Sequence, residues 1–160
     1  MTQPAQRPGR SVQEVRTPPE FLDAVRSLLA IDAFSIDLAA GHDSCVVSRY
    51  LSEDLDSLTY PWAACLGVGQ WAWLHPPFAY IEPWVEQALH EKAHLANYAG
   101  IAMLVPAVVG SNWWRDFVHQ HCHVHFLNGR LPQPYPKDCA LLLYSHTAAP
   151  GYTVWDWKGR

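Results

Sequence analysis

The stretch Trp71–Trp84, WAWLHPPFAYIEPW, decides the fold of this chain, because a strand and a helix meet in it. The continuous apolar run Trp71–Leu74 predicts a buried strand. His75 and two consecutive prolines follow, and a helical pattern begins near Tyr80. Proline has no backbone N–H to donate and holds the chain extended, so we expect the strand to end at His75. Residues at this end project from the carboxyl edge of a sheet, where open α/β folds bind ligands.

Upstream of this stretch, the sequence predicts a helix that ends near Ala30. Thr17 can cap it, Pro18 suits the first helical position, and Glu20 stands where a capping box needs it. Apolar residues then recur at helical spacing between positions 21 and 29, which gives the helix one apolar face.

A short buried strand is predicted over Ala33–Ala40, ending in Asp37, small residues and Gly41. A carboxylate and a glycine just past a strand suit a turn in which a ligand approaches the backbone. An ordinary turn between two elements explains the same residues. The acidic segment Ser52–Trp62 shows no clear period and predicts a loop before the next strand.

The second half of the chain continues the alternation of strands and helices. Gly100 is predicted to end the helix that begins near Tyr80, and Ile101–Val105 reads as another buried strand. Ser111 is predicted to cap a short helix over Asn112–His119.

Two further strands are predicted near the end of the chain, a buried one over Cys139–Ser145 and an edge strand over Thr153–Trp157. Strands that alternate with helices indicate a three-layer α/β sheet in one compact domain, residues 17–160. Residues 1–16 have no apolar period and are predicted to form a flexible arm.

Composition argues against some functions and locations. The 160 residues carry a formal net charge of −4, so no global positive field draws the chain to nucleic acid. This disfavours a non-specific DNA coat but not an enzyme with a local basic patch. The four cysteines form no CxxC pair and follow no secretory signal, so we expect reduced thiols in a cytosolic protein. No apolar run approaches the roughly 20 residues of a membrane span.

The histidine-rich segment His119–His125, HQHCHVH, resembles a set of metal ligands at first sight. On a strand, however, His121, His123 and His125 point to one face while Cys122 points to the other. Such a row has no fixed tetrahedral geometry, so we expect no metal site here.

The order of elements around the double proline resembles that of the phage-type DNA adenine N6-methyltransferases, the Dam family. In that family the loop reads Asn or Asp, Pro, Pro, Tyr or Phe, and here it reads His75, Pro76, Pro77, Phe78. The resemblance extends from about Thr17 to Ser145 through short motifs in the same order. It implies a Rossmann-like methyltransferase sheet that binds S-adenosylmethionine and methylates the N6 amine of adenine in double-stranded DNA.

The resemblance also implies roles for individual residues. The exocyclic amine of adenine is a poor nucleophile, and the family loop helps by accepting hydrogen bonds from both N–H groups of a base flipped out of the duplex. His75, Pro76, Pro77 and Phe78 would form this catalytic loop, with Phe78 stacking on the base. Residues at the cofactor end would be Thr17, Pro18, Asp37, Ala39, Gly41 and Asp56. Trp84 and Arg130 would contact the substrate.

Some of these assignments have open alternatives at the level of sequence. Asp54 or Asp56 can accept a hydrogen bond from the cofactor, or can simply belong to a solvated acidic loop. Arg130, after Gly129, can present a guanidinium to a phosphate or to the cofactor, or can be an exposed solvated side chain. The resemblance further implies a phage or prophage protein acting in the bacterial cytoplasm.

Two departures from the family pattern leave a second hypothesis open. His75 replaces the Asn or Asp, and the segment after Arg130 is short and rich in proline. A neutral imidazole has one acceptor nitrogen, and a histidine with an ordinary pKa near 6.5 loses it as the pH falls. The alternative is therefore a catalytically impaired family member that acts as a DNA- or cofactor-binding protein.

Overall fold

The computed structural model describes residues 16–41, 44–52, 56–132, 135 and 138–159. Over these residues the chain forms a mixed α/β domain around a six-stranded sheet in the order β1-β2-β3-β5-β4-β6. The strands are β1 Ile36–Asp37, β2 Trp71–Leu74, β3 Gly100–Pro106, β4 His123–Asn128, β5 Cys139–Ser145 and β6 Gly151–Asp156. The predicted arm over residues 1–16 lies outside the described residues except for Arg16.

The direction of the strands changes within the sheet. β1, β2 and β3 are parallel neighbours, whereas β5 runs antiparallel to both β3 and β4, and β6 is parallel to β4. The carboxyl ends of β1 and β2 therefore meet at one edge, which is the arrangement that a ligand site of the predicted kind requires. The finer expectation of a Rossmann-like methyltransferase sheet stays a prediction.

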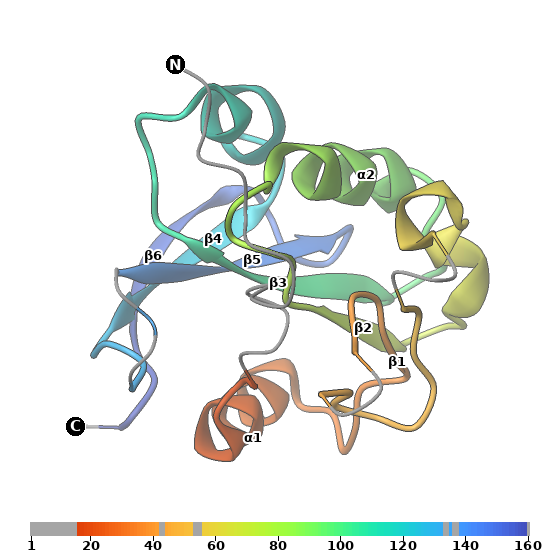
Figure 1. Cartoon of the computed structure of the whole chain (residues 1–160), viewed down its shortest axis with the longest axis horizontal. Helices are drawn as coiled ribbons and strands as arrows, with labels where there is room; N and C mark the ends of the chain where they lie inside the picture. Colours follow the sequence, from red (N-terminus) through yellow and green to blue (C-terminus); the bar gives the residue numbers. More distant parts are fainter. Residues whose placement is uncertain (1–15, 42–43, 53–55, 133–134, 136–137, 160) are drawn as a thin grey trace.

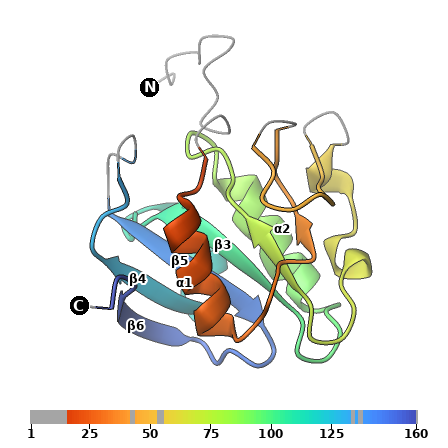
Figure 2. The same ribbon diagram turned by 90° about the horizontal axis from the view of Figure 1, so that it is seen from below.

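Helices cover both faces of the sheet (Figure 1). The helix α1, Pro19–Leu29, lies on one face, and α2, Glu82–Lys92, lies on the other together with the short helix η5, Trp114–Val118. Figure 2, turned by 90°, shows α1 lying across its face of the sheet. This arrangement agrees with the predicted three layers.

The buried strands contribute side chains to the hydrophobic cores on both faces of the sheet. In β3, Ile101, Met103 and Val105 pack into the core cluster that includes α2, while Ala102 and Leu104 pack into the cluster that includes α1. Alternate side chains of a strand point to opposite faces, so both faces must be apolar when both are covered. The continuous apolar runs predicted as strands β2, β3 and β5 are confirmed for this reason.

The prediction that Gly100 ends the second helix is wrong. The helix α2 ends at Lys92, and Gly100 is the first residue of β3, paired with Trp71 of β2. A Cβ atom at position 100 would lie 2.4 Å from the Trp71 ring. Glycine is required here because the indole packs against the backbone, and not because a helix stops.

The strand predicted over Ala33–Ala40 is much shorter than expected. Only Ile36 and Asp37 form β1, and directly after it the Asp37 carboxylate accepts a hydrogen bond from the Ala39 N–H at 3.2 Å. An aspartate that bonds the backbone two residues on bends the chain into a turn.

The start of α1 also differs from its prediction. Pro18, not Thr17, is the residue that precedes the first helical turn, and no side chain caps the helix there. The end of the helix at Ala30 is confirmed, with that residue in the left-handed conformation. The Thr17 hydroxyl is therefore not used for capping and has another partner in the structure.

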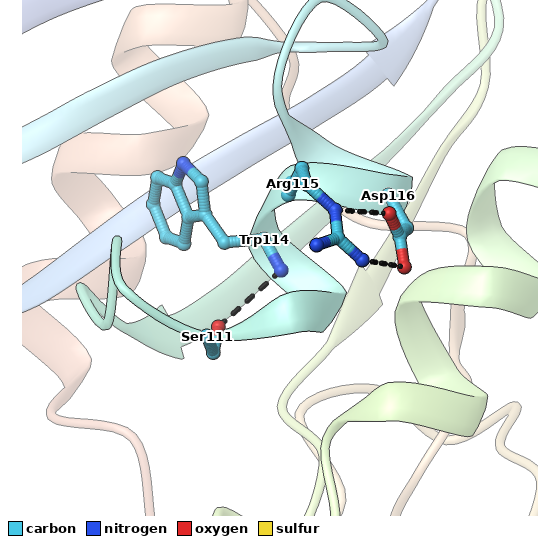
Figure 3. A network of polar contacts seen from close by, with 4 residues as sticks. All are labelled: Ser111, Trp114, Arg115 and Asp116. Carbon is cyan, nitrogen blue, oxygen red and sulfur yellow. Dashed lines mark hydrogen bonds and ion pairs between the residues drawn. The ribbon is translucent and has the colours of Figure 1, made fainter.

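The short helix after Ser111 begins as predicted. The Ser111 hydroxyl oxygen accepts a hydrogen bond from the Trp114 N–H at 3.3 Å, and Arg115 forms an ion pair with the adjacent Asp116 (Figure 3). The five residues Trp114–Val118 take π-helical geometry in place of a regular α-helix. Among the helices of the described residues, none has the length and apolar character needed to cross a membrane.

Candidate active site

The ends of β1 and β2 bring together residues that the sequence predicted separately. Asp37 pairs with Trp73 in the parallel register, so the turn after β1 lies beside the His75 loop after β2. A small cavity of about 10 Å³, with room for about one water molecule, lies between them. Its lining residues are Thr17, Asp37, Ala39, Ser44, Val46, Trp73 and His75.

Asp37 is a buried carboxylate held by the backbone. The Ala39 N–H donates to its Oδ1 at 3.2 Å, and the Val46 N–H donates to its Oδ2 at 3.0 Å. Only 2% of the residue is exposed, and burial raises the pKa of this carboxyl to about 6, although the two backbone hydrogen bonds lower it. At neutral pH the site therefore holds a negative charge that water solvates poorly, and a cationic or hydrogen-donating ligand would stabilise it.

His75 is a buried neutral imidazole. It is 8% exposed, and its Nδ1 lies 3.0 Å from the Thr17 hydroxyl. Burial lowers the pKa of His75 from 6.5 to about 4, so the imidazole keeps an acceptor nitrogen below the pH at which an unperturbed histidine loses it. Nε2 is also buried, and no hydrogen-bond partner for it is found among the described residues. The Thr17 hydroxyl thus holds one ring nitrogen, and the other is shielded from solvent.

Two aromatic rings surround the imidazole. The Phe78 ring lies 5.2 Å from it at 58°, and the Tyr135 ring stacks on it at 5.7 Å and 23°. Phe78 and Tyr135 also contact each other edge to face, with ring centroids 6.2 Å apart. Phe78 is partly exposed and Tyr135 is buried, so Phe78 is the ring that a ligand can reach more readily.

Comparison with known families decides which kind of protein carries this site. The family model described as DNA N-6-adenine-methyltransferase (Dam) matches residues 10–136, which is more than half of the chain. The chain belongs to this family. The Dam match includes Thr17, Asp37 and the His75–Phe78 loop, so the site lies wholly in the part of the chain shared with the Dam family. No curated protein matches the chain.

Dam membership places the chain among DNA adenine methyltransferases and confirms the resemblance seen in the sequence. The strands β5 and β6 lie beyond the matched region. A phage origin is not part of what the match shows and stays a prediction.

Several predicted site residues are not part of the cavity lining. Pro18 is buried directly before α1, and the Gly41 N–H donates to the Ser44 hydroxyl at 3.0 Å. Asp56 is exposed and has a positive φ of 49°. Their contact with a cofactor stays a prediction, and Asp54 lies outside the described residues.

The two predicted substrate contacts also lie apart from the cavity lining. Trp84 is buried in the core and stacks on Trp62, with ring centroids 6.1 Å apart. Packing alone accounts for this residue. Arg130 is exposed and pairs with the exposed Asp138 at 2.9 Å, so its guanidinium is available at the surface, and its contact with DNA stays a prediction.

Sequence reasoning missed Ser44, Val46, Trp73 and Tyr135. Val46 and Trp73 are ordinary core residues in the sequence, and only the fold places them beside Asp37 and His75. A tyrosine among prolines is a weak signal, and the ring contact between Tyr135 and His75 spans far too many residues for any local pattern to show it.

The predicted alternation holds within β4, which begins at His123, whereas His121 lies in the turn before that strand. Cys122 and Val124 are buried on one side, while His123 bonds the Ala149 carbonyl and the Thr153 hydroxyl on the other. Within the ranges that the structure describes, no group of three or more His, Cys, Asp or Glu residues is placed to hold a metal ion.

Proposed function

We propose that this protein transfers a methyl group from S-adenosylmethionine to the N6 amine of adenine in DNA. The observation that carries the proposal is the convergence of two strand ends in one cavity. Asp37, predicted for the cofactor, and His75, predicted for catalysis, line the same space in a chain of the Dam family. The sequence alone did not predict that these two residues line one cavity.

The residues around Asp37 fit a cationic cofactor. S-adenosylmethionine, when bound, supplies an electrophilic methyl group on a positively charged sulfur. Thr17, Asp37 and Ala39 would hold it, since a buried carboxylate that accepts from neutral backbone N–H groups favours a positive partner. The cavity has room for only about one water molecule, so the bound cofactor must extend beyond it or displace lining side chains.

The His75 loop supports the acceptor of the methyl group. Neutral His75 would accept one N–H of the adenine amine through Nε2, and the carbonyl of Pro76 would accept the other. Two prolines hold that carbonyl in place before the substrate arrives, which is what electrostatic assistance requires. Phe78 would stack on the flipped base.

His75 also supports a second candidate function. Because it stands where the family has Asn or Asp, the chain can be a member that binds cofactor or DNA without methyl transfer. A buried imidazole accepts from the amine in only one tautomer, whereas an amide oxygen has no such requirement.

Two assays on the purified protein distinguish the enzyme from the binding protein. Incubation of the protein with labelled S-adenosylmethionine and DNA should give N6-methyladenine, and calorimetry should show cofactor binding that Asp37→Ala weakens by about 1–3 kcal/mol. Cofactor binding without any methyladenine would favour the binding protein. An unchanged dissociation constant for Asp37→Ala would remove Asp37 from the cofactor site.

A further inference from the structure

The strand β6 forms one edge of the sheet. Among the described residues, β4 is the only strand that pairs with it, and the two strands run parallel. Figure 2 shows β6 at the rim of the sheet. Two of its apolar side chains are largely in solvent, with Tyr152 45% and Val154 70% exposed. The far side of β6 therefore presents backbone groups that no strand of the described residues pairs.

The backbone groups on this open side belong to every second residue. The Gly151 N–H donates to the carbonyl of Cys122, the residue before β4, at 3.4 Å. In a parallel pair only alternate residues of a strand bond to a given neighbour, so the odd-numbered residues of β6 face β4. The even-numbered residues turn their N–H and C=O groups outward, and they are Tyr152, Val154 and Asp156.

The sequence of β6 contains none of the features that keep an open edge from pairing. Natural edge strands carry lysine, proline or a bulge. The stretch 151–155, GYTVW, has no charged residue and no proline, and its register with β4 continues without a bulge to Asp156. Donors and acceptors at every second residue are matched by another extended strand, as in β-strand addition.

A second copy of the same strand matches this open edge. In an antiparallel register centred on Thr153, Tyr152 of one copy lies opposite Val154 of the other. Both residues face outward, so this pair exchanges backbone hydrogen bonds in both directions. The two-fold symmetry of the register repeats the pair on the other side of Thr153. The Tyr152 and Val154 side chains then lie about 5 Å apart across the strands and cover each other from solvent.

The next outward residue also fits this register. Asp156 lies opposite Pro150 of the second copy, and proline has no N–H to donate. The Asp156 carbonyl needs no donor from there, because it accepts from the Gly159 N–H of its own chain at 3.1 Å. The Asp156 N–H can donate to the Pro150 carbonyl, and no like charge lies opposite the carboxylate. The outward donors and acceptors of β6 are therefore complementary to those of a second copy.

We propose that two copies of this chain associate through β6, antiparallel and about a two-fold axis at Thr153, so that their sheets join into one. Each copy offers the same strand, so the interface is closed and the assembly ends at a dimer. Antiparallel pairing directs the carboxyl ends of the two β2 strands to opposite ends of the joined sheet. Each copy thus keeps its own His75 loop, and the association does not depend on the proposed function.

Sedimentation of the purified full chain at several concentrations measures the association. The wild type should sediment as a dimer that dissociates on dilution. Val154→Pro removes an outward N–H and leaves the bonds to β4 in place. It should raise the dimer dissociation constant about tenfold to a hundredfold, since each symmetric pair loses one hydrogen bond. Val154→Thr keeps the N–H and the β-branched shape, and as the matched control it should leave the constant nearly unchanged.

Thr153→Lys is the second test variant in case Val154→Pro does not fold. Thr153 is exposed, and the substitution places two ammonium groups directly opposite each other at the two-fold axis. This variant should be monomeric at concentrations where the wild type is a dimer. Added salt should restore part of the association, because it screens the repulsion.

Cysteine cross-linking tests the register itself. Thr153 lies opposite its own copy in a pair without hydrogen bonds, where the Cα atoms are about 4.5 Å apart, a separation that a disulfide can span. Oxidised Thr153→Cys should therefore run as a covalent dimer on a denaturing gel without reductant. Asp156→Cys, whose sulfur would face Pro150 of the second copy, should not, and neither should the wild type with its four cysteines.

Three results would overturn the proposal. They are a wild type that stays monomeric at its highest soluble concentration, a dimer that both edge variants leave intact, and a Thr153→Cys protein that cross-links no more than Asp156→Cys. Since β6 lies outside residues 10–136 of the Dam match, a folded monomeric variant should methylate DNA at the wild-type rate per chain. A protein that dimerises in this register but methylates no adenine would contradict the proposed function and leave the dimer intact.

Discussion

Replacement of Asp37 by Asn should change how the stability of this protein depends on pH. The folded state raises the pKa of the Asp37 carboxyl from 3.8 to about 6. Between these values the folded state binds more protons than the unfolded state, so the free energy of unfolding falls as the pH rises. A shift of about 2 pKa units corresponds to about 3 kcal/mol, lost between pH 4 and pH 6–7.

The wild-type curve alone does not isolate this contribution. Burial lowers the pKa values of His75 and His125 from 6.5 to about 4. For these two residues the unfolded state binds more protons over the same interval, so their contributions to stability rise with pH. The informative quantity is therefore the difference in unfolding free energy between wild type and Asp37→Asn at each pH.

Urea unfolding at a series of pH values from 4 to 7.5 measures this difference. It should change by about 3 kcal/mol across the range, with the wild type losing stability relative to Asp37→Asn as the pH rises. Asp32→Asn, the same substitution at an exposed position, is the control for the change of charge. Parallel curves for wild type and Asp37→Asn would show that Asp37 is not the desolvated carboxyl described here.

Three further substitutions test the packing and the proposed roles. Phe78→Ala should weaken the binding of single-stranded or flipped adenine by about 1–3 kcal/mol in a titration. Tyr80→Ala, at an exposed neighbouring position, should leave this affinity unchanged. An insoluble Phe78→Ala protein would indicate that Phe78 belongs to the core instead. His75→Asn should raise the methylation rate up to about tenfold and remove the loss of activity near pH 4. A folded variant that binds the cofactor but has no activity would favour the second hypothesis, a binding protein. Gly100→Ala should lower the unfolding free energy by about 1–3 kcal/mol, because the added Cβ meets the Trp71 ring. Gly110→Ala places its Cβ in open space and should change the stability little. Equal stabilities of the two variants would contradict the packing described.

The elements that the sequence predicted correctly are those with a local signal. The apolar runs of β2, β3 and β5 are continuous because both faces of each strand are buried, and their residues could be read directly as strands. The double proline after β2 likewise marks its end without reference to the rest of the chain.

The errors concern residues whose role depends on distant partners. Glycine is a residue type typical of helix ends, but Gly100 lies in β3 because the Trp71 ring packs against its backbone. Threonine is a residue type typical of helix caps, but the Thr17 hydroxyl bonds His75, which lies 58 residues further along the chain. A local pattern contains no information about such contacts.

The candidate site shows the same division. The His75–Phe78 loop and Asp37 were found through short motifs, and their meeting follows from the parallel pairing of β1 with β2. Tyr135 was missed because its ring reaches His75 across the fold. The lowered pKa of His75 was also missed, since burial of an imidazole depends on every element that packs around it.

Methylation of DNA in living cells tests the central claim most directly. The protein is expressed in a host that lacks adenine methylation, and the host DNA is sequenced by a method that detects modified bases, with Phe78→Ala expressed in parallel. The account predicts N6-methyladenine in a defined sequence context for the wild type, and much less of it for the variant. Unmodified adenine throughout the DNA, from cells that contain folded protein able to bind S-adenosylmethionine, would contradict it.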